Sequence, residues 1–150
     1  MITITKMTAT HISQVYEIES HSFSDPWPIE EILWEMENAI CQVARVDGQV
    51  VGYTVMRHIA DEGHIINIAT HESHRKSGVS SALMEELIAI AKSRDMIGIT
   101  LEVRIGNRAA MGLYHKYGFT VEGYRRKFYS YPTEDAAIMW KYLKHDNNCF

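Results

Sequence analysis

A short run of small residues behind two cations is the first candidate for chemistry in this sequence. Ser77-Gly78-Val79-Ser80-Ser81 stands between a strand-like and a helix-like segment, and Arg75 and Lys76 come just before it. Small residues at such a junction let the backbone approach a ligand, and the free N–H groups of a first helical turn favour an anion. The pattern suits the phosphates of a larger cofactor. It also suits an ordinary capped helix after a solvated basic loop, so spacing alone leaves both interpretations open.

Two other groups of side chains have simpler explanations. His58, His64, His71 and His74 match no common zinc spacing, so we expect surface residues and no metal site. The segment 125–131 mixes basic and aromatic residues, as single-stranded nucleic-acid binders do. One short patch on an acidic chain is weak evidence for such a partner, so we expect no direct nucleic-acid binding.

Hydrophobic spacing predicts the elements that must position this chemistry. Pro28 suits the first turn of a helix, and Asp47-Gly48 tolerates the positive φ angles of a tight hairpin. Residues 124–132 have turn and aromatic character. The predicted strands lie at 2–4, 40–46, 50–57, 64–70, 99–103, from 119 onward and at 136–142, and the predicted helices at 12–18, 29–36, 79–90 and 107–117. This order describes an α/β protein with a mixed sheet and helices on both faces.

Bulk properties bound the class of protein. The 150 residues, with 46% hydrophobic and 23% charged residues and a net charge of -4, fit one globular domain over 1–150. Cys41 and Cys149 are poorly arranged for a disulfide framework, which favours a reducing compartment and a cytoplasmic location. We expect no membrane partner, since no apolar run could span a bilayer and no targeting pattern opens the chain. The oligomeric state is open, and a monomer is compatible with the sequence.

Several segments together resemble one enzyme family. Arg75 to Ser80 is similar to the coenzyme A loop Q/R-x-x-G-x-G/A of the GNAT acetyltransferase superfamily, with Ser80 where the family has Gly or Ala. The run L-E-V-R-x-x-N-x-x-A-x-x-L-Y-x-x-x-G-F in 101–119 is more specific, and it looks like the RimI branch, the ribosomal-protein alanine N-acetyltransferases. NIAT at 67–70 and EDAAIM at 134–139 resemble the same branch, so the likeness covers essentially the whole chain. It implies the GNAT fold, a mostly antiparallel sheet of about seven strands flanked by about four helices.

The resemblance assigns proton transfer to two residues. Glu102 alternates with apolar neighbours and points away from their shared face, and it matches the family's general base, which takes the proton of the attacking amine. Tyr114 matches the general acid that protonates the leaving thiolate of coenzyme A. Without the motif, we would favour a salt bridge from Glu102 to Arg104 or a solvated position, and core packing for Tyr114.

The family also implies binding roles. The backbone of Ile68, Ala69 and Thr70 would hold the pantetheine arm, and one N–H would face the developing oxyanion. Asn107 matches a coenzyme A contact, although it equally suits a helix N-cap, and the Ser80 hydroxyl could add a phosphate contact. The cofactor-binding set is Ile68, Ala69, Thr70, Arg75, Lys76, Ser77, Gly78, Val79, Ser80, Ser81 and Asn107. Trp27, Tyr129 and Tyr131 would line the acceptor path, with cover for the core edge as the alternative. Pro28 stands where the family often has Ser.

The expected function is therefore transfer of acetyl from acetyl-CoA to a protein N-terminal amine, most simply the N-terminal alanine of a small-subunit ribosomal protein. No cysteine lies in the matched motifs, which agrees with direct attack and no acetyl-enzyme. Two alternatives remain. One is a GNAT enzyme of broader N-terminal, lysine or small-molecule amine specificity. The other is a non-catalytic acyl-CoA-binding module.

Overall fold

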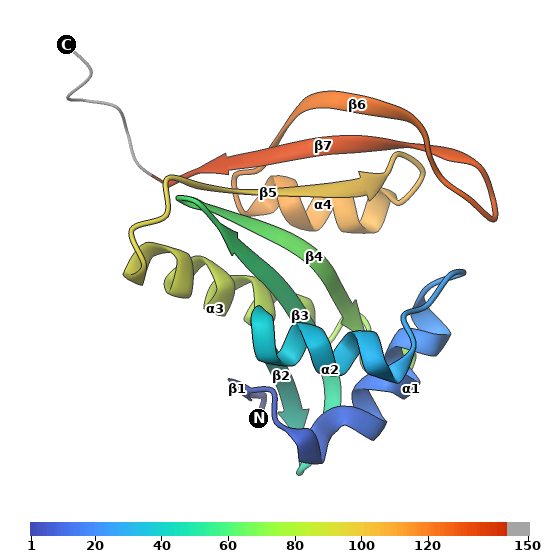
Figure 1. Cartoon of the computed structure of the whole chain (residues 1–150), viewed down its shortest axis with the longest axis vertical. Coiled ribbons are helices and arrows are strands. Elements are labelled where there is room, and N and C mark those ends of the chain that lie inside the picture. Colours follow the sequence, from blue (N-terminus) through green and yellow to red (C-terminus); the bar gives the residue numbers. More distant parts are fainter. Residues whose placement is uncertain (144–150) are drawn as a thin grey trace. The chain divides into compact units, whose positions relative to one another are not determined.

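The computed structural model describes residues 1–143 (Figure 1). These residues group into two compact units, one formed by residues 1–57 and 65–87 and the other by residues 58–64 and the chain from 88 onward. Cys149 lies outside the described residues, and the expectation of one domain over 1–150 stays a prediction.

The predicted α/β class is confirmed. The strands are β1 (Thr3–Lys6), β2 (Ile40–Val46), β3 (Gln49–Ile59), β4 (Glu62–Thr70), β5 (Gly98–Arg104), β6 (Thr120–Tyr129) and β7 (Glu134–Tyr142). The helices of the described residues are α1 (Ile12–Ser22), α2 (Ile29–Asn38), α3 (Val79–Ser93) and α4 (Arg108–Lys116), with 3₁₀ turns at Ala9–His11 and Glu72–His74. The strand order is β1-β2-β3-β4-β5-β7-β6 in a seven-stranded sheet. The pairs β1–β2, β2–β3, β5–β7 and β6–β7 are antiparallel.

Local turn chemistry behaves as the sequence predicts at the β2–β3 hairpin. Asp47 and Gly48 have φ angles of 51° and 79°, in the left-handed region that a tight hairpin needs. Pro28 differs slightly from the expectation because it is the N-cap of α2, one residue before the first turn. Its carbonyl accepts hydrogen bonds from the N–H groups of Glu31 and Ile32, so it still starts the helix.

The segment expected to be turn-like is mostly a strand, which corrects the sequence prediction. β6 runs to Tyr129, and only residues 130–133 turn before β7 begins. Tyr124 and Arg125 pair with β7, the register then shifts before Tyr129, and Lys127 has a φ of 51°. Because β6 ends the strand order and is exposed from Tyr124 to Phe128, no apolar alternation marks it as a strand.

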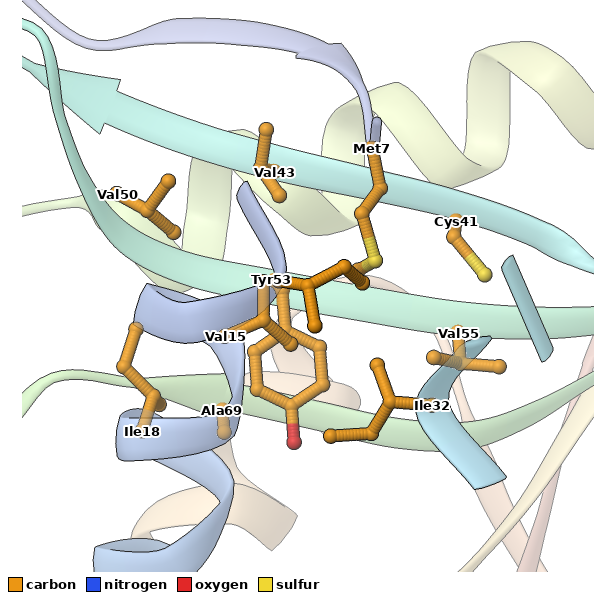
Figure 2. Packing of buried hydrophobic residues seen from close by; sticks show 11 residues of the cluster. Met7, Val15, Ile18, Ile32, Cys41, Val43, Val50, Tyr53, Val55 and Ala69 are labelled. Carbon is orange, nitrogen blue, oxygen red and sulfur yellow. The ribbon is translucent and has the colours of Figure 1, made fainter. Parts of the chain in front are cut away.

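The first unit has its core on both faces of β2. Cys41 and Val43 join one cluster, while Ala44 and Val46 belong to another, as the period of two requires. Figure 2 shows the first cluster, in which α1 and α2 bury Val15, Ile18 and Ile32 around the ring of Tyr53. Val79 and Leu83 from the start of α3 join the second cluster. In this unit, therefore, helices cover both sheet faces.

α2 is fastened to β3 by an ion pair. The Glu35 side chain is fully buried, and Arg57, at 37% exposure, contacts it with two nitrogens. The Nε–Oε1 distance is 3.1 Å, and the guanidinium also lies 5.9 Å from the Trp34 ring centroid. The buried Glu35 carboxylate is thus paired with the Arg57 guanidinium.

Arg57→Met is expected to lower the free energy of unfolding by about 2–3 kcal/mol, because it leaves the Glu35 carboxylate buried without a cation. Chemical denaturation of the variant measures this. The double variant Glu35→Leu with Arg57→Met removes both charges and should recover most of the loss. A double variant no more stable than the single one would contradict this explanation.

The second unit carries β5, β7 and β6 with α4. Ile99, Leu101 and Val103 of β5 are buried, so Glu102 falls on the opposite side of that strand. No helix in residues 1–143 has the length and apolar character needed to span a membrane.

Candidate active site

The predicted phosphate loop connects β4 to α3 within the first unit. The chain leaves β4 at Thr70, makes the 3₁₀ turn Glu72–His74, and turns again over residues 75–78 before α3 begins at Val79. Lys76 and Gly78 have φ angles of 61° and 88°. A left-handed Gly78 at this point lets the chain enter the helix without strain.

Close packing fixes where α3 starts. A Cβ atom at Gly52 of β3 would come within 2.8 Å of Val79 Cγ1 and 3.0 Å of the Ala69 carbonyl oxygen. Gly52 therefore lets the first turn of α3 lie directly against β3 and β4. The backbone N–H groups of that turn, which have no partner within the helix, therefore lie beside the end of β4.

The loop itself fits a phosphate ligand. Arg75, Lys76, Ser77 and Gly78 are exposed, and a Cβ at Gly78 would meet only the Ile2 side chain, at 4.0 Å. The space in front of the glycine is thus free for a ligand to approach the backbone. The Ser77 hydroxyl donates to the His74 carbonyl oxygen, which shapes the turn.

The Ser80 hydroxyl has a role that the sequence did not predict. Its Oγ lies 2.7 Å from Oγ1 of Thr70, a hydrogen bond that ties the start of α3 to the end of β4. Ser80 is half-buried, and Thr70 is buried. Ile68 and Ser81 are half-buried, and Ala69 is buried. Ser80, which stands where the family has Gly or Ala, therefore links the start of α3 to the end of β4.

Trp27 is held by a buried carboxylate that sequence reasoning missed. Glu19 is only 1% exposed, and its Oε2 accepts a 2.9 Å hydrogen bond from the backbone N–H of Trp27. Its Oε1 accepts hydrogen bonds from the Tyr53 hydroxyl and, at 2.7 Å, from Asn67 Nδ2. Burial and the adjacent Glu19 raise the pKa of Tyr53. The sequence signal that could have indicated this buried carboxylate is that Glu19 directly follows the apolar Ile18 of the same helix.

A cavity of about 270 Å³ lies in the same unit, between α1 and the segment that follows β4. Arg75 is the only predicted site residue in its lining, which consists of Glu17, Ile18, His21, Ser22, His71, Glu72 and Arg75. Within residues 1–143, no group of three or more His, Cys, Asp and Glu side chains could hold a metal ion.

Glu102 projects from β5 in the second unit with unused hydrogen-bonding capacity. Its side chain is 29% exposed, while Oε2 is buried and has no hydrogen-bond partner among the described residues. Arg125 Nε lies 3.6 Å from that oxygen, which is an ion-pair contact. Arg104, the alternative partner expected for Glu102, forms an ion pair with Glu134 at 3.2 Å. A buried acceptor left open in this way can take a proton or bind a donor.

Tyr114 lies on α4 at 5% exposure, with its ring centroid 5.8 Å from that of Phe119. Tyr114 therefore packs in the core, which is the role that we would favour for it without the motif. Burial, with a smaller contribution from Tyr129, raises the pKa of Tyr114. The side chain therefore stays a protonated phenol at neutral pH, which is the form a proton donor needs.

Tyr129 links the other two residues electrostatically. Burial, and next the charge of Glu102, raise the pKa of Tyr129 to about 12. Tyr129 in turn contributes to the raised pKa of Tyr114. The second unit thus brings Glu102, Tyr114 and Tyr129 together, although they come from β5, α4 and β6.

Asn107 and Tyr131 lie at more open positions in the same unit. The Asn107 Oδ1 accepts a 3.1 Å hydrogen bond from the Ala110 N–H, so its N-cap role is confirmed. Tyr131 is 76% exposed in the turn between β6 and β7. Its ring is available to a ligand and covers little of the core.

The loop over residues 75–81 lies in the first unit, and Glu102, Tyr114 and Tyr129 lie in the second. The model of the Acetyltransferase (GNAT) family matches residues 9–119, and the chain belongs to that family. It is therefore an acetyl-CoA-dependent N-acetyltransferase. Its relatives place it in the RimI-like branch.

Three relatives show how far the likeness extends. A Bacillus subtilis (strain 168) protein, provisionally named a ribosomal protein bS18-alanine N-acetyltransferase, is 34% identical over 91% of this chain and 93% of its own length. The ribosomal protein bS18-alanine N-acetyltransferase of Escherichia coli (strain K12) is 31% identical over 93% and 96%. The crystal structure of the ribosomal-protein-S18-alanine N-acetyltransferase from Escherichia coli matches with a TM-score of 0.89 and 28% identity over 100% of both chains. The predicted GNAT fold and RimI-like membership are thus confirmed.

Proposed function

We propose that this chain acetylates the N-terminal α-amine of a protein in the cytoplasm, namely the N-terminal alanine of a small-subunit ribosomal protein. The observation that carries the chemistry is Glu102 Oε2, a buried acceptor without a hydrogen-bond partner among the described residues, in the same unit as a protonated Tyr114. The names of the relatives support the choice of acceptor.

Acetyl-CoA supplies an activated thioester, and the side chains of this chain move the protons. Glu102 takes a proton from the attacking amine, whose pKa is near about 8 for a protein N-terminus. Tyr114 gives its phenolic proton to the departing sulfur. No covalent acetyl-enzyme is needed, because the nitrogen attacks the thioester carbon directly.

Cys41 does not suit a covalent route. It is 3% exposed, its Sγ donates to the Glu35 carbonyl oxygen at 3.3 Å, and burial raises the pKa of its thiol to about 12. A nucleophilic cysteine needs the opposite, an accessible thiol with a lowered pKa.

The remaining candidates have binding roles in this proposal. Residues 75–81 hold the phosphates, with Arg75 and Lys76 as cations and the α3 amides as donors. The backbone of Ile68–Thr70 binds the pantetheine arm, and Asn107 adds a contact through the part of its amide that the cap leaves open. Trp27, Tyr129 and Tyr131 line the acceptor path.

Steady-state assays with an acceptor panel test this function. Peptides beginning with Ala should be acetylated at least about tenfold more efficiently, in kcat/KM, than peptides with a bulky first residue or a blocked α-amine. Free polyamines and internal lysines should react poorly, and EDTA should not change turnover. Faster turnover of small amines than of every peptide would establish the broader-specificity alternative. Acetyl-CoA binding without transfer to any acceptor would establish the binding module.

A further inference from the structure

The turn between β6 and β7 is held by one side chain from another strand. Arg104 Nη1 donates to the Pro132 carbonyl oxygen at 2.8 Å, and Nη2 donates to the Ser130 carbonyl oxygen at 2.9 Å. These two carbonyls bracket Tyr131, which is 76% exposed and has a φ of 55°. The guanidinium fork thus fixes the backbone on either side of an outward-pointing tyrosine.

The same guanidinium also contacts the neighbouring tyrosine. Arg104 Cζ lies 4.5 Å from the ring centroid of Tyr129, within the range of a cation–π contact. One arginine therefore contacts the Tyr129 ring and the two carbonyls that flank Tyr131, and the proposed function assigns both tyrosines to the acceptor path.

Glu134 completes the arrangement. Its Oε1 accepts from Arg104 Nη1 at 3.2 Å, and its Oε2 accepts from the Gly106 N–H at 2.7 Å. A Cβ at Gly106 would lie 2.5 Å from that Oε2, so only glycine lets the carboxylate approach the backbone here. Arg104 and Glu134 are 25% and 23% exposed, so this network is partly shielded from water.

Arg104 and Glu102 stand two residues apart on β5, and their side chains therefore leave the same face of the strand. The strand that carries the candidate base thus also carries the group that sets the β6–β7 turn. A displacement of the turn relative to Glu102 would require this fork to break.

We propose that Arg104 is a positioning residue, which holds the β6–β7 turn so that Tyr129 and Tyr131 present the acceptor peptide to Glu102. The inference rests on the proposed function for the role of the two tyrosines. In this role Arg104 contacts neither the thioester nor the amine, and it acts on acceptor binding through the position of the turn.

Arg104→Met tests this, because it keeps an unbranched side chain near Tyr129 and removes both carbonyl contacts. The KM for an Ala-initiated peptide should rise about tenfold, with kcat and the Kd for acetyl-CoA changed less than about threefold. Arg104→Lys keeps the charge but loses the fork, and it should give an intermediate KM. Arg126→Met, at an exposed β6 position, is the matched control and should leave the KM unchanged.

Hydrogen exchange provides a readout that is independent of activity. The amides of residues 129–131, 133 and 134 should exchange faster in Arg104→Met than in wild type, and Arg126→Met should behave as wild type. Unchanged exchange in Arg104→Met would overturn the proposal, as would faster exchange with an unaltered peptide KM. If Arg104→Met does not fold, the same comparison with Arg104→Lys decides the question. A wild-type enzyme that acetylates no peptide would refute the proposed function, while the exchange result would still report on the turn.

Discussion

Glu102→Gln is expected to lower kcat for an Ala-initiated peptide by about 100- to 10,000-fold at pH 7, the usual range for loss of a general base. The amide has nearly the shape of the carboxylate but cannot accept the amine proton. Because Oε2 has no hydrogen-bond partner among the described residues and only an ion-pair contact with Arg125, the substitution breaks no hydrogen bond of that oxygen. Stability and acetyl-CoA affinity should therefore stay close to wild type.

The pH profile separates this role from a structural one. Above about pH 8, a growing fraction of the N-terminal amine is already deprotonated, so the deficit of Glu102→Gln should shrink between pH 7 and pH 9.5. Glu37→Gln, an exposed carboxylate on α2, is the matched control and should show no deficit. A Glu102→Gln variant with wild-type turnover would remove Glu102 from its assigned role.

Tyr114→Phe is expected to reduce the single-turnover rate of acetyl transfer by about 100-fold or more, because the departing thiolate loses its proton donor. The ring of phenylalanine fills the same buried space beside Phe119, so the free energy of unfolding should change little. Single-turnover measurement is needed since product release could mask a slower chemical step.

The pH dependence of the wild type and a control variant complete this test. Burial raises the pKa of Tyr114 above its ordinary value near 10, so its deprotonation should not limit wild-type activity up to about pH 10. Tyr124→Phe, at a 64% exposed position on β6, controls for the loss of a tyrosine hydroxyl and should keep the wild-type rate. Equal rates for Tyr114→Phe and wild type would leave Tyr114 with a packing role only.

Much of the fold is encoded by local patterns. The period-two and helical spacings predict the order of strands and helices, and Asp47-Gly48 predicts its hairpin because both residues tolerate positive φ. Asn107 predicts the start of α4 because its short amide reaches the Ala110 N–H. The start of β6 is predicted, but its continuation through Arg125–Lys127 is not, because this segment is exposed and an exposed edge strand needs no apolar alternation.

The candidate site divides in the same way. The sequence by itself determined the family, the loop of small residues before α3, and the direction of Glu102 away from its apolar neighbours, since each depends on residues close in the chain. Only the tertiary structure decided that Glu19 accepts hydrogen bonds from Trp27, Tyr53 and Asn67. The same is true of the hydrogen bonds that Arg104 donates to two carbonyls of a turn 26 to 28 residues away. Such contacts join residues that are distant in sequence and become neighbours only when strands pair and helices pack. A glutamate in a helix or an arginine in a strand does not by its residue type indicate which distant residue it will contact.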